Sequence, residues 1–184
     1  MKVILIMVSS LNGKITRGDD SDPTHWASKE DTALFASMKA QHNLIVMGSR
    51  TYEASQNKIK LKDSVLRIVL TNNPKRYESY TAPGQLEFTN EHPKHLVKRL
   101  EAQRFKKLLL VGGGETNTAF FKERLVDEIH LTLEPVLFGN GKPLISEGQF
   151  ETKLRLTRSE KLNGKGTLHL VYNVIKQCYT KNHG

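Results

Sequence analysis

A run of three glycines separates a short apolar segment, residues 108–111, from a stretch whose pattern predicts a helix. The glycines are Gly112, Gly113 and Gly114, and the helix opens with Glu115 and Thr116. Backbone N–H groups at such a turn, together with the positive end of the helix dipole, favour a pyrophosphate. The spacing matches neither the Rossmann fingerprint nor the Walker loop. The segment predicts a phosphate site, and the alternative is a tight turn that only tolerates glycine.

Two further strand ends bear polar side chains that suit a nucleotide. An apolar run, residues 44–47, is followed by Gly48, Ser49, Arg50 and Thr51, and a second run from residue 65 ends at Thr71 and Asn72. Either one alone is typical of a surface turn or a helix cap. Ligands of open α/β sheets gather at the carboxyl ends of parallel strands. Three such ends on successive strands therefore predict a site for one extended dinucleotide.

Ionisable side chains also follow the first strand and begin the first helix. Asn12 and the glycine after it predict a turn that brings Lys14 to the sheet edge, although a lysine beside a turn is normally just solvated. Ser28 and Asp31 have the Ser-x-x-acid spacing of a capping box, so Asp31 is a candidate helix cap. The seven histidines show no metal-ligand spacing, and we expect no metal.

The order of apolar runs predicts an α/β protein. Up to residue 121 strands and helices alternate, which predicts parallel strands joined by crossover helices. Apolar and polar residues then alternate at 129–133, 154–156 and 168–174, which indicates antiparallel strands with one wet face. Residues 163–166 supply the turn of a C-terminal hairpin. We expect one domain over residues 1–178, a tail at 179–184, and a mixed, mostly parallel sheet with helices on its faces.

Composition limits the class of protein. Cys178 is the only cysteine, which excludes an intramolecular disulfide and a cysteine-rich zinc site and predicts a reducing compartment, the cytoplasm. No apolar run approaches the roughly 20 residues of a membrane span, so no membrane partner is expected. The net charge of +9 is spread along the chain without a basic tract, which argues against nucleic acid and suits a phosphorylated cofactor or simple solubility.

Taken together, these motifs resemble the dihydrofolate reductase superfamily, and more specifically its branch that includes the C-terminal reductase domain of riboflavin biosynthesis. The segment 10–15 resembles the Ser-Leu-Asp-Gly-Lys-Ile signature of the riboflavin reductases. Segments 47–53 and 111–114 resemble the cofactor segment and the pyrophosphate glycines of dihydrofolate reductases, and 125–131 with 135–139 resembles the closing strand and loop. The resemblance implies a dihydrofolate reductase-like three-layer fold with helices on both faces of the sheet, and NADPH across the three strand ends.

The same resemblance distributes the substrate-side roles. Asp31 and Phe35 match the acid and the phenylalanine, four residues apart, of dihydrofolate reductases, and Thr132 matches the threonine that supports that acid. Lys14 matches a substrate-site lysine of the riboflavin reductases. Those enzymes usually have Glu-Gly-Gly where this chain has Gly112 and the next two glycines, so one carboxylate is missing. We expect a small heterocyclic substrate to contact further residues of this region, namely Asn12, Trp26 and Ser28.

The predicted reaction is hydride transfer from NADPH to a C=N or similar carbon of that substrate. Lys14 would bind or polarise the substrate, and Asp31 would orient it or relay a proton. Reduction of the phosphoribosylamino-pyrimidine of riboflavin synthesis is favoured, with dihydrofolate or a related pteridine or pyrimidine as the alternative. The alternative of another class is a nucleotide- or nucleic-acid-binding protein without catalysis. The resemblance also implies a homodimer.

Overall fold

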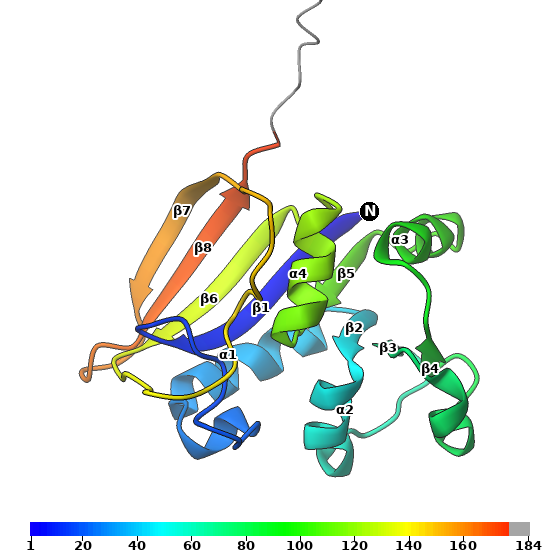
Figure 1. Ribbon diagram of the computed structural model, residues 1–184, viewed down its shortest axis with the longest axis horizontal. Coiled ribbons are helices and arrows are strands. Elements are labelled where there is room, and N and C mark those ends of the chain that lie inside the picture. Colours follow the sequence, from blue (N-terminus) through cyan, green and yellow to red (C-terminus); the bar gives the residue numbers. More distant parts are fainter. Residues whose placement is uncertain (177–184) are drawn as a thin grey trace, which may run out of the picture.

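Apolar runs form the centre of one eight-stranded sheet in the computed structural model, which describes residues 1–176. The strands follow the order β4-β3-β2-β5-β1-β6-β8-β7 (Figure 1). Their bounds are β1 Lys2–Ser10, β2 Leu44–Gly48, β3 Leu66–Leu70, β4 Leu86–Thr89, β5 Lys107–Leu110, β6 Glu128–Glu134, β7 Leu154–Lys161 and β8 Leu168–Val174. The first six in spatial order run parallel, and β8 and β7 close the sheet as an antiparallel hairpin.

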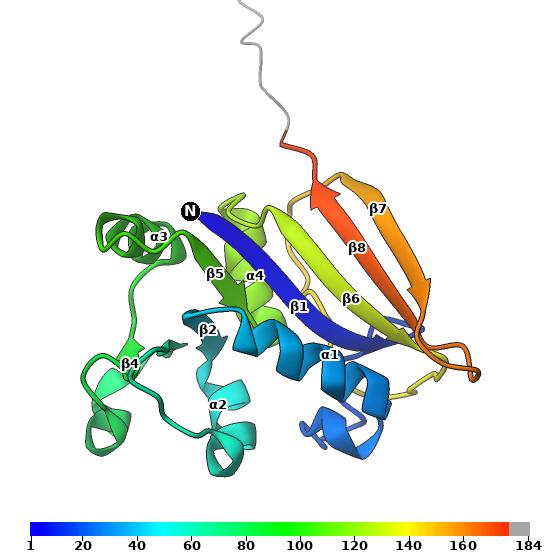
Figure 2. The same ribbon diagram turned by 180° about the vertical axis from the view of Figure 1, so that it is seen from behind.

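The helices cover both faces of the sheet, as the resemblance implies. Their bounds are α1 Lys29–Ala40, α2 Ser49–Ser55, α3 Pro93–Ala102 and α4 Gly114–Lys122. Helices α3 and α4 lie on one face, and α1 lies on the other, across β1 and β2 (Figures 1 and 2). Each face has its own core. Leu5 and Leu110 pack with Leu100 and Phe120 of α3 and α4, and alternate sheet residues such as Ile4 pack toward α1.

Two expectations for the C-terminal strands were wrong in part. Strand β6 is antiparallel to β8 but parallel to β1, because it lies between the parallel strands and the C-terminal hairpin of β8 and β7. Strand β7 does not have one wet face, since all eight of its residues are exposed, including Leu154 and Leu156. It is the last strand of the sheet, beyond the area that α1 or α4 covers (Figure 2). The predicted domain end at 178, the tail 179–184 and Cys178 lie outside the described residues.

Two further expectations concern membrane-spanning helices and metal sites. None of the helices in residues 1–176 is long and apolar enough to cross a membrane. Within the same residues no three His, Cys, Asp or Glu side chains form a cluster that could hold a metal ion.

Candidate functional site

Two helices begin side by side where β2 and β5 end. Helix α2 has Gly48 as its N-cap and α4 has Gly113, and neither start has a side-chain cap. Gly48 N–H donates to the carbonyl of Gly112 (2.8 Å), which joins the two turns. A Cβ at Gly48 would lie 2.4 Å from Thr116 Oγ1, so the two turns are in close contact. The structure thus brings together two of the three predicted cofactor segments, with first-turn N–H groups that no side chain caps.

The three glycines differ in what they make possible. Gly112 has φ +92°, and a Cβ there would lie 2.8 Å from Met7 Sδ. A Cβ at Gly114 would lie 2.3 Å from the carbonyl oxygen of Pro143, whose loop packs across the start of α4. Gly113 has an ordinary φ of −74°, and its nearest neighbour would be Thr51 Oγ1 at 3.4 Å. Only Gly113 combines an ordinary backbone with space beside it, so the need for glycine at 112 and 114 has a structural cause.

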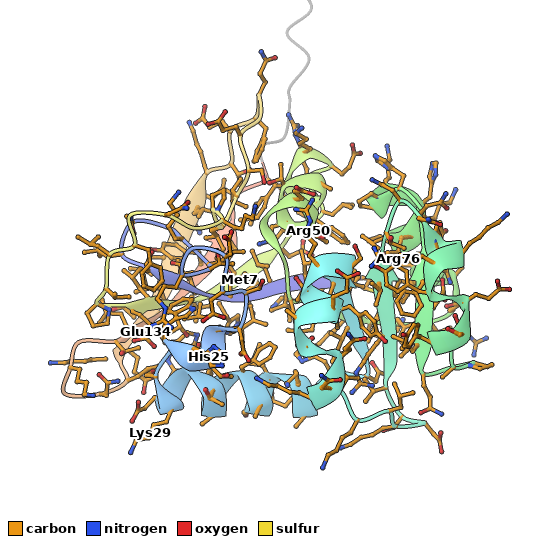
Figure 3. The ribbon with its side chains drawn as sticks, turned by 60° about the horizontal axis from the view of Figure 1, so that its bottom comes forward. Met7, His25, Lys29, Arg50, Arg76 and Glu134 are labelled. Carbon is orange, nitrogen blue, oxygen red and sulfur yellow. The ribbon has the colours of Figure 1, made fainter. Side chains whose placement is uncertain are left out.

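Charged side chains border this end of the site. Arg50 donates to Glu115 Oε1 (2.8 Å), and both side chains are 70% exposed. Figure 3 shows Arg50 at the start of α2 and Arg76 beyond it toward β4. Arg76 pairs with Glu53 (3.2 Å). Two predicted cofactor residues, Arg50 and Glu115, are therefore each other's partners in the structure.

The third strand end lies one strand farther along the edge. Leu70, the last residue of β3, is in register with Gly48, so Thr71 follows at the same level as the helix starts. Thr71 Oγ1 accepts a hydrogen bond from the N–H of Asn73 (3.2 Å), and Asn72 is exposed. The segment is a polar turn at the place where the sequence predicts part of a dinucleotide site, and its role stays a prediction.

The start of α1 forms a second, more buried group. Ser28 is the N-cap, and its Oγ accepts a hydrogen bond from the N–H of Asp31 (3.2 Å). In a complete capping box the acid would in turn accept from the N–H of Ser28. That N–H instead donates to Glu134 Oε1 (2.7 Å). Glu134 thus takes over the reciprocal half of the capping box, and the Asp31 carboxyl is not needed as a cap.

Asp31 is buried beside another acid. It is 7% exposed, and burial raises the pKa of its carboxyl from 3.8 to about 6. The nearby Thr132 hydroxyl lowers the pKa, and the negative charge of Glu134 raises it. Thr132 is itself fully buried, and its hydroxyl has no hydrogen bond of normal geometry within the described part of the chain. A carboxyl that is half protonated near pH 6 keeps a protonated fraction at neutral pH and can act as a proton donor.

The loop after β6 connects the acidic group to the first-strand loop. Trp26 packs edge-on against Phe138 (5.1 Å between ring centroids), and its buried Nε1 has no partner among residues 1–176. Both polar atoms of the Asn12 amide bond the backbone of Phe138, at 2.8 and 3.2 Å. Asn12 therefore holds this loop in place, and a substrate contact by its side chain stays untested. Phe35 packs against the core under α1.

Lys14 lies in the loop after β1 and forms an isolated antiparallel bridge with Pro143. Its backbone N–H donates to Ser10 Oγ (3.0 Å), while its ammonium group has no ion pair or hydrogen bond with another described residue. A Cβ placed at Gly113 would lie 3.9 Å from Cδ1 of the next residue, Ile15. The loop that follows β1 therefore approaches the glycine turn at Ile15 and is bonded to the loop after β6 through Asn12.

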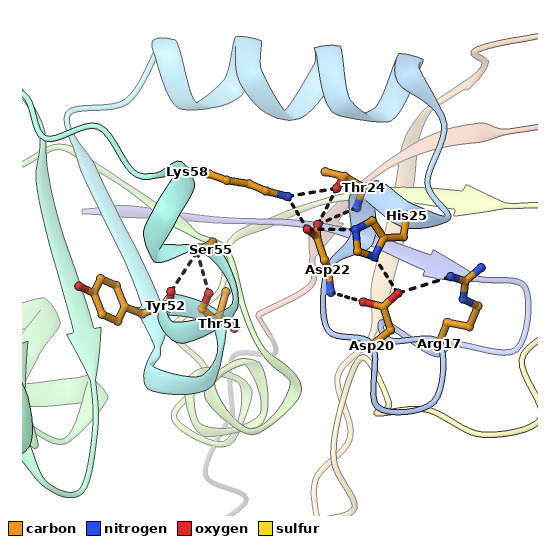
Figure 4. Close-up of polar contacts among 9 residues, drawn as sticks. All are labelled: Arg17, Asp20, Asp22, Thr24, His25, Thr51, Tyr52, Ser55 and Lys58. Atoms are coloured by element: carbon orange, nitrogen blue, oxygen red, sulfur yellow. Dashed lines mark hydrogen bonds and ion pairs between the residues drawn. The ribbon is translucent and has the colours of Figure 1, made fainter.

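A polar network fastens the rest of this loop to the other side of the site (Figure 4). Lys58, just after α2, pairs with Asp22 and donates to Thr24 Oγ1 (3.2 Å). His25 lies between Asp20 and Asp22, at 2.9 and 3.7 Å. Burial by itself would raise the pKa of Asp22, but hydrogen bonds from Lys58 and Thr24 hold it at about 2. The network links the loop before α1 to the segment after α2.

Sequence reasoning missed Glu134. It is 5% exposed and stands in β6 two residues after Thr132, so both side chains lie on one face of the strand. The signal in the sequence was weak, because Glu134 is only a polar residue two positions after Thr132 and directly before Pro135. Nothing in the local sequence indicates that its partner is the backbone of Ser28, more than a hundred positions away.

Comparisons with known proteins identify the family of this chain. Residues 1–168 match the family model of the RibD C-terminal domain. The chain is 28% identical over 179 residues to the uncharacterized protein YwjB of Bacillus subtilis, covering 92% of this chain and 97% of that one.

Solved structures show the same fold at low identity. A diaminohydroxyphosphoribosylaminopyrimidine deaminase/5-amino-6-(5-phosphoribosylamino)uracil reductase from Thermotoga maritima has TM-score 0.73 at 14% identity, over 95% of this chain and 56% of that chain. Dihydrofolate reductase from Enterococcus faecalis, complexed with NADP(H), has TM-score 0.63 at 19% identity, over 95% and 97%. The dihydrofolate reductase-like fold is confirmed, and the chain belongs to the RibD C-terminal domain family, a family of reductases.

Proposed function

We propose that this protein is an NADPH-dependent reductase that adds a hydride and a proton to a C=N bond of a small heterocyclic substrate. The observation on which this rests is Asp31, a buried acid whose capping role Glu134 has taken over. It lies in the first turn of α1, and β5 and β2, the two strands that follow β1 on the side away from β6, end at the two uncapped helix starts. One sheet edge thus offers a place for an anionic cofactor and, next to it, a proton donor.

The glycine end fits the diphosphate of NADPH. The first-turn N–H groups of α2 and α4 have no side-chain cap, and Gly113 leaves the backbone accessible beside Thr51. Such N–H groups with two helix dipoles attract anions. The residues proposed to line the cofactor site are Gly48, Ser49, Arg50, Thr51, Thr71, Asn72, Gly112, Gly113, Gly114, Glu115 and Thr116. A relative of the same fold, the dihydrofolate reductase above, was solved with NADP(H).

When bound at the glycine end, NADPH would supply the hydride for the carbon of the C=N bond and would be oxidised to NADP⁺. Asp31 gives its proton to the nitrogen as the O–H bond breaks, so that C=N becomes CH–NH and the carboxylate is reprotonated from water. Because burial keeps the carboxyl partly protonated near pH 6, it can act in this way close to neutrality.

For the substrate we favour a phosphoribosylamino-pyrimidine of the 5-amino-6-(5-phosphoribosylamino)uracil type. The supporting observation is the free ammonium of Lys14, a cation available for the substrate phosphate. Dihydrofolate is the second candidate, because Asp31 and Thr132 are placed as a pterin would need. Gly112 offers no carboxylate to either substrate.

Turnover of NADPH with each candidate tests the proposal, measured as loss of the dihydronicotinamide absorbance. We expect Asp31→Asn to lower kcat/KM on the accepted substrate by roughly a hundredfold, the lower range for a general acid. With a phosphorylated substrate, Lys14→Ala should lower kcat/KM about thirtyfold or more, since a charged hydrogen bond is lost. With dihydrofolate the same change should have little effect.

The outcomes separate the candidates. A large effect of Lys14→Ala on the ribosyl substrate supports the first, and turnover of dihydrofolate with a silent Lys14→Ala supports the second. If NADPH binds but neither compound nor a related pteridine is reduced, the chain is a nucleotide-binding protein without this activity. If NADPH does not bind, the reductase proposal is wrong.

A further inference from the structure

Glu134 is a buried acid without a cationic partner. Its two carboxylate oxygens each accept one hydrogen bond, from the N–H of Ser28 (2.7 Å) and from the hydroxyl of Thr167 (2.7 Å). It makes no ion pair with any side chain of residues 1–176. Two neutral donors compensate only in part for removing a carboxylate from water. A buried glutamate at this position therefore lowers the stability of the fold. Its position beside Asp31 suggests that it has a role in the site.

The register of the sheet places Glu134 near the reacting group. In β6 it pairs with Ser10 of β1, as Thr132 pairs with Val8, so both side chains point to the α1 face. Figure 3 shows Glu134 beside the start of α1. Through the N–H of Ser28 it fixes the residue that caps the N–H of Asp31. Glu134 is thus two hydrogen bonds away from the backbone of Asp31.

We propose that Glu134 is a positioning residue of this site, which fixes the start of α1 and keeps a negative charge beside Asp31 so that Asp31 retains the proton it donates. This inference rests on the proposed reductase function. It assigns Glu134 no contact with the substrate.

Thr132 is a second observation that indicates a ligand at the acid pair. Its hydroxyl is fully buried and lowers the pKa of Asp31, but it makes no hydrogen bond of normal length and angle with a described residue. A buried hydroxyl whose hydrogen bonding is incomplete costs stability unless a ligand completes it. The pair of acids therefore borders a place where a substrate group belongs.

The other titratable groups around Asp31 do not supply a competing charge. On α1, Glu30 accepts a hydrogen bond from Asn163 (3.1 Å), and Lys165 acts on Glu30. On β8, His169 is in register with Thr132 and contacts His130 (3.2 Å). Burial lowers the pKa of His169, which keeps its imidazole neutral at neutral pH. The charge that acts on Asp31 across the site is that of Glu134.

The experiment measures the Asp31 carboxyl directly, by carbon NMR of the whole protein labelled at the aspartate carboxyl carbon. Asp31→Asn assigns the signal. We expect a pKa of about 6 in the unmodified protein and a decrease of about one unit in Glu134→Gln, because the like charge is removed. A glutamine oxygen still accepts from the N–H of Ser28, so the helix start is kept. Glu128→Gln, on the same face of the same strand, is the charge-matched control and should leave the signal unchanged.

The pH profile of kcat/KM gives the second readout. Activity that needs protonated Asp31 falls as pH rises through its pKa, so Glu134→Gln should move this limb down by the same unit and lower activity above it about tenfold. A merely structural role would lower stability without moving either value. An Asp31 pKa that is the same in Glu134→Gln as in the unmodified protein overturns the inference. Because the NMR titration needs no substrate, its result stands apart from any failure of the reductase function itself.

Discussion

The two ends of the site are built on opposite principles. The glycine end consists of backbone, with two uncapped helix starts whose side chains are small or point to solvent. The acidic end consists of buried side chains held by one another, from Ser28 through Glu134 to Thr167. An anion is recognised by N–H groups that lie on the surface and need no partner until it arrives. A proton donor near neutrality needs burial and a neighbouring charge, which only distant parts of the chain can supply.

The largest expected effect compares two neighbouring glycines. Gly112→Ala would force a side chain into φ +92° and against Met7 Sδ at 2.8 Å, and should lower the free energy of unfolding by about 3–4 kcal/mol. Gly113→Ala has an ordinary φ and should keep its stability while weakening NADPH binding tenfold or more, because its Cβ faces the ligand beside Thr51. Denaturant unfolding and a fluorescence titration with NADPH measure the two quantities. Equal stability losses in both variants would mean that Gly113 is also structural.

The sequence indicated the glycine end and most of the fold because those signals are local. A run such as 108–111 before three glycines predicts strand, turn and helix without knowledge of the rest of the chain. It could not show why glycine is needed at 112 and 114, since that depends on Met7 beside Gly112 and on the loop at Pro143 beside Gly114. It left Asp31 undecided between cap and site acid for the same reason, because the residue that decides is Glu134 on another strand.

The second prediction concerns stability at the acidic end. The folded-state pKa of Asp31 lies about two units above its ordinary value, so stability falls as pH rises from about 4 through 6. Asp31→Asn removes this cost and should raise the free energy of unfolding by about 2–3 kcal/mol at pH 8. Below pH 4, where the acid is protonated in both states, the gain should vanish. Urea unfolding at both pH values measures it, and a variant that is less stable at pH 8 would contradict the burial argument.

The third prediction tests cofactor choice at the glycine end. Arg76 and Lys75 follow the third strand end, and the exposed Arg76 pairs with Glu53 (3.2 Å) and lies over the ring of Tyr77. A 2′-phosphate would take up this cation, since a charge-assisted hydrogen bond contributes about 1.5–3 kcal/mol. NADPH should therefore bind at least tenfold more tightly than NADH, and Arg76→Ala should reduce that ratio while affinity for NADH stays the same. Equal affinities for NADPH and NADH in the unmodified protein would show that the glycine end does not recognise the 2′-phosphate.

The smallest effect is expected at the ion pair between Arg50 and Glu115. It tests the difference between the glycine end and the acidic end of the site most directly. Both side chains are 70% exposed, so Glu115→Gln should change the free energy of unfolding by less than about 0.5 kcal/mol. Loss of the negative charge frees Arg50 at the two helix starts and removes repulsion toward an anion, so NADPH should bind a few-fold more tightly, and more so at low salt. Glu128→Gln, far from this edge, is the control of equal charge. At the acidic end removal of one carboxylate alters a pKa or the stability of the fold, whereas here it should alter only the affinity for an anion. Unchanged or weaker NADPH binding in Glu115→Gln would show that Glu115 does not compete with the ligand for Arg50, and would place the phosphates away from this pair.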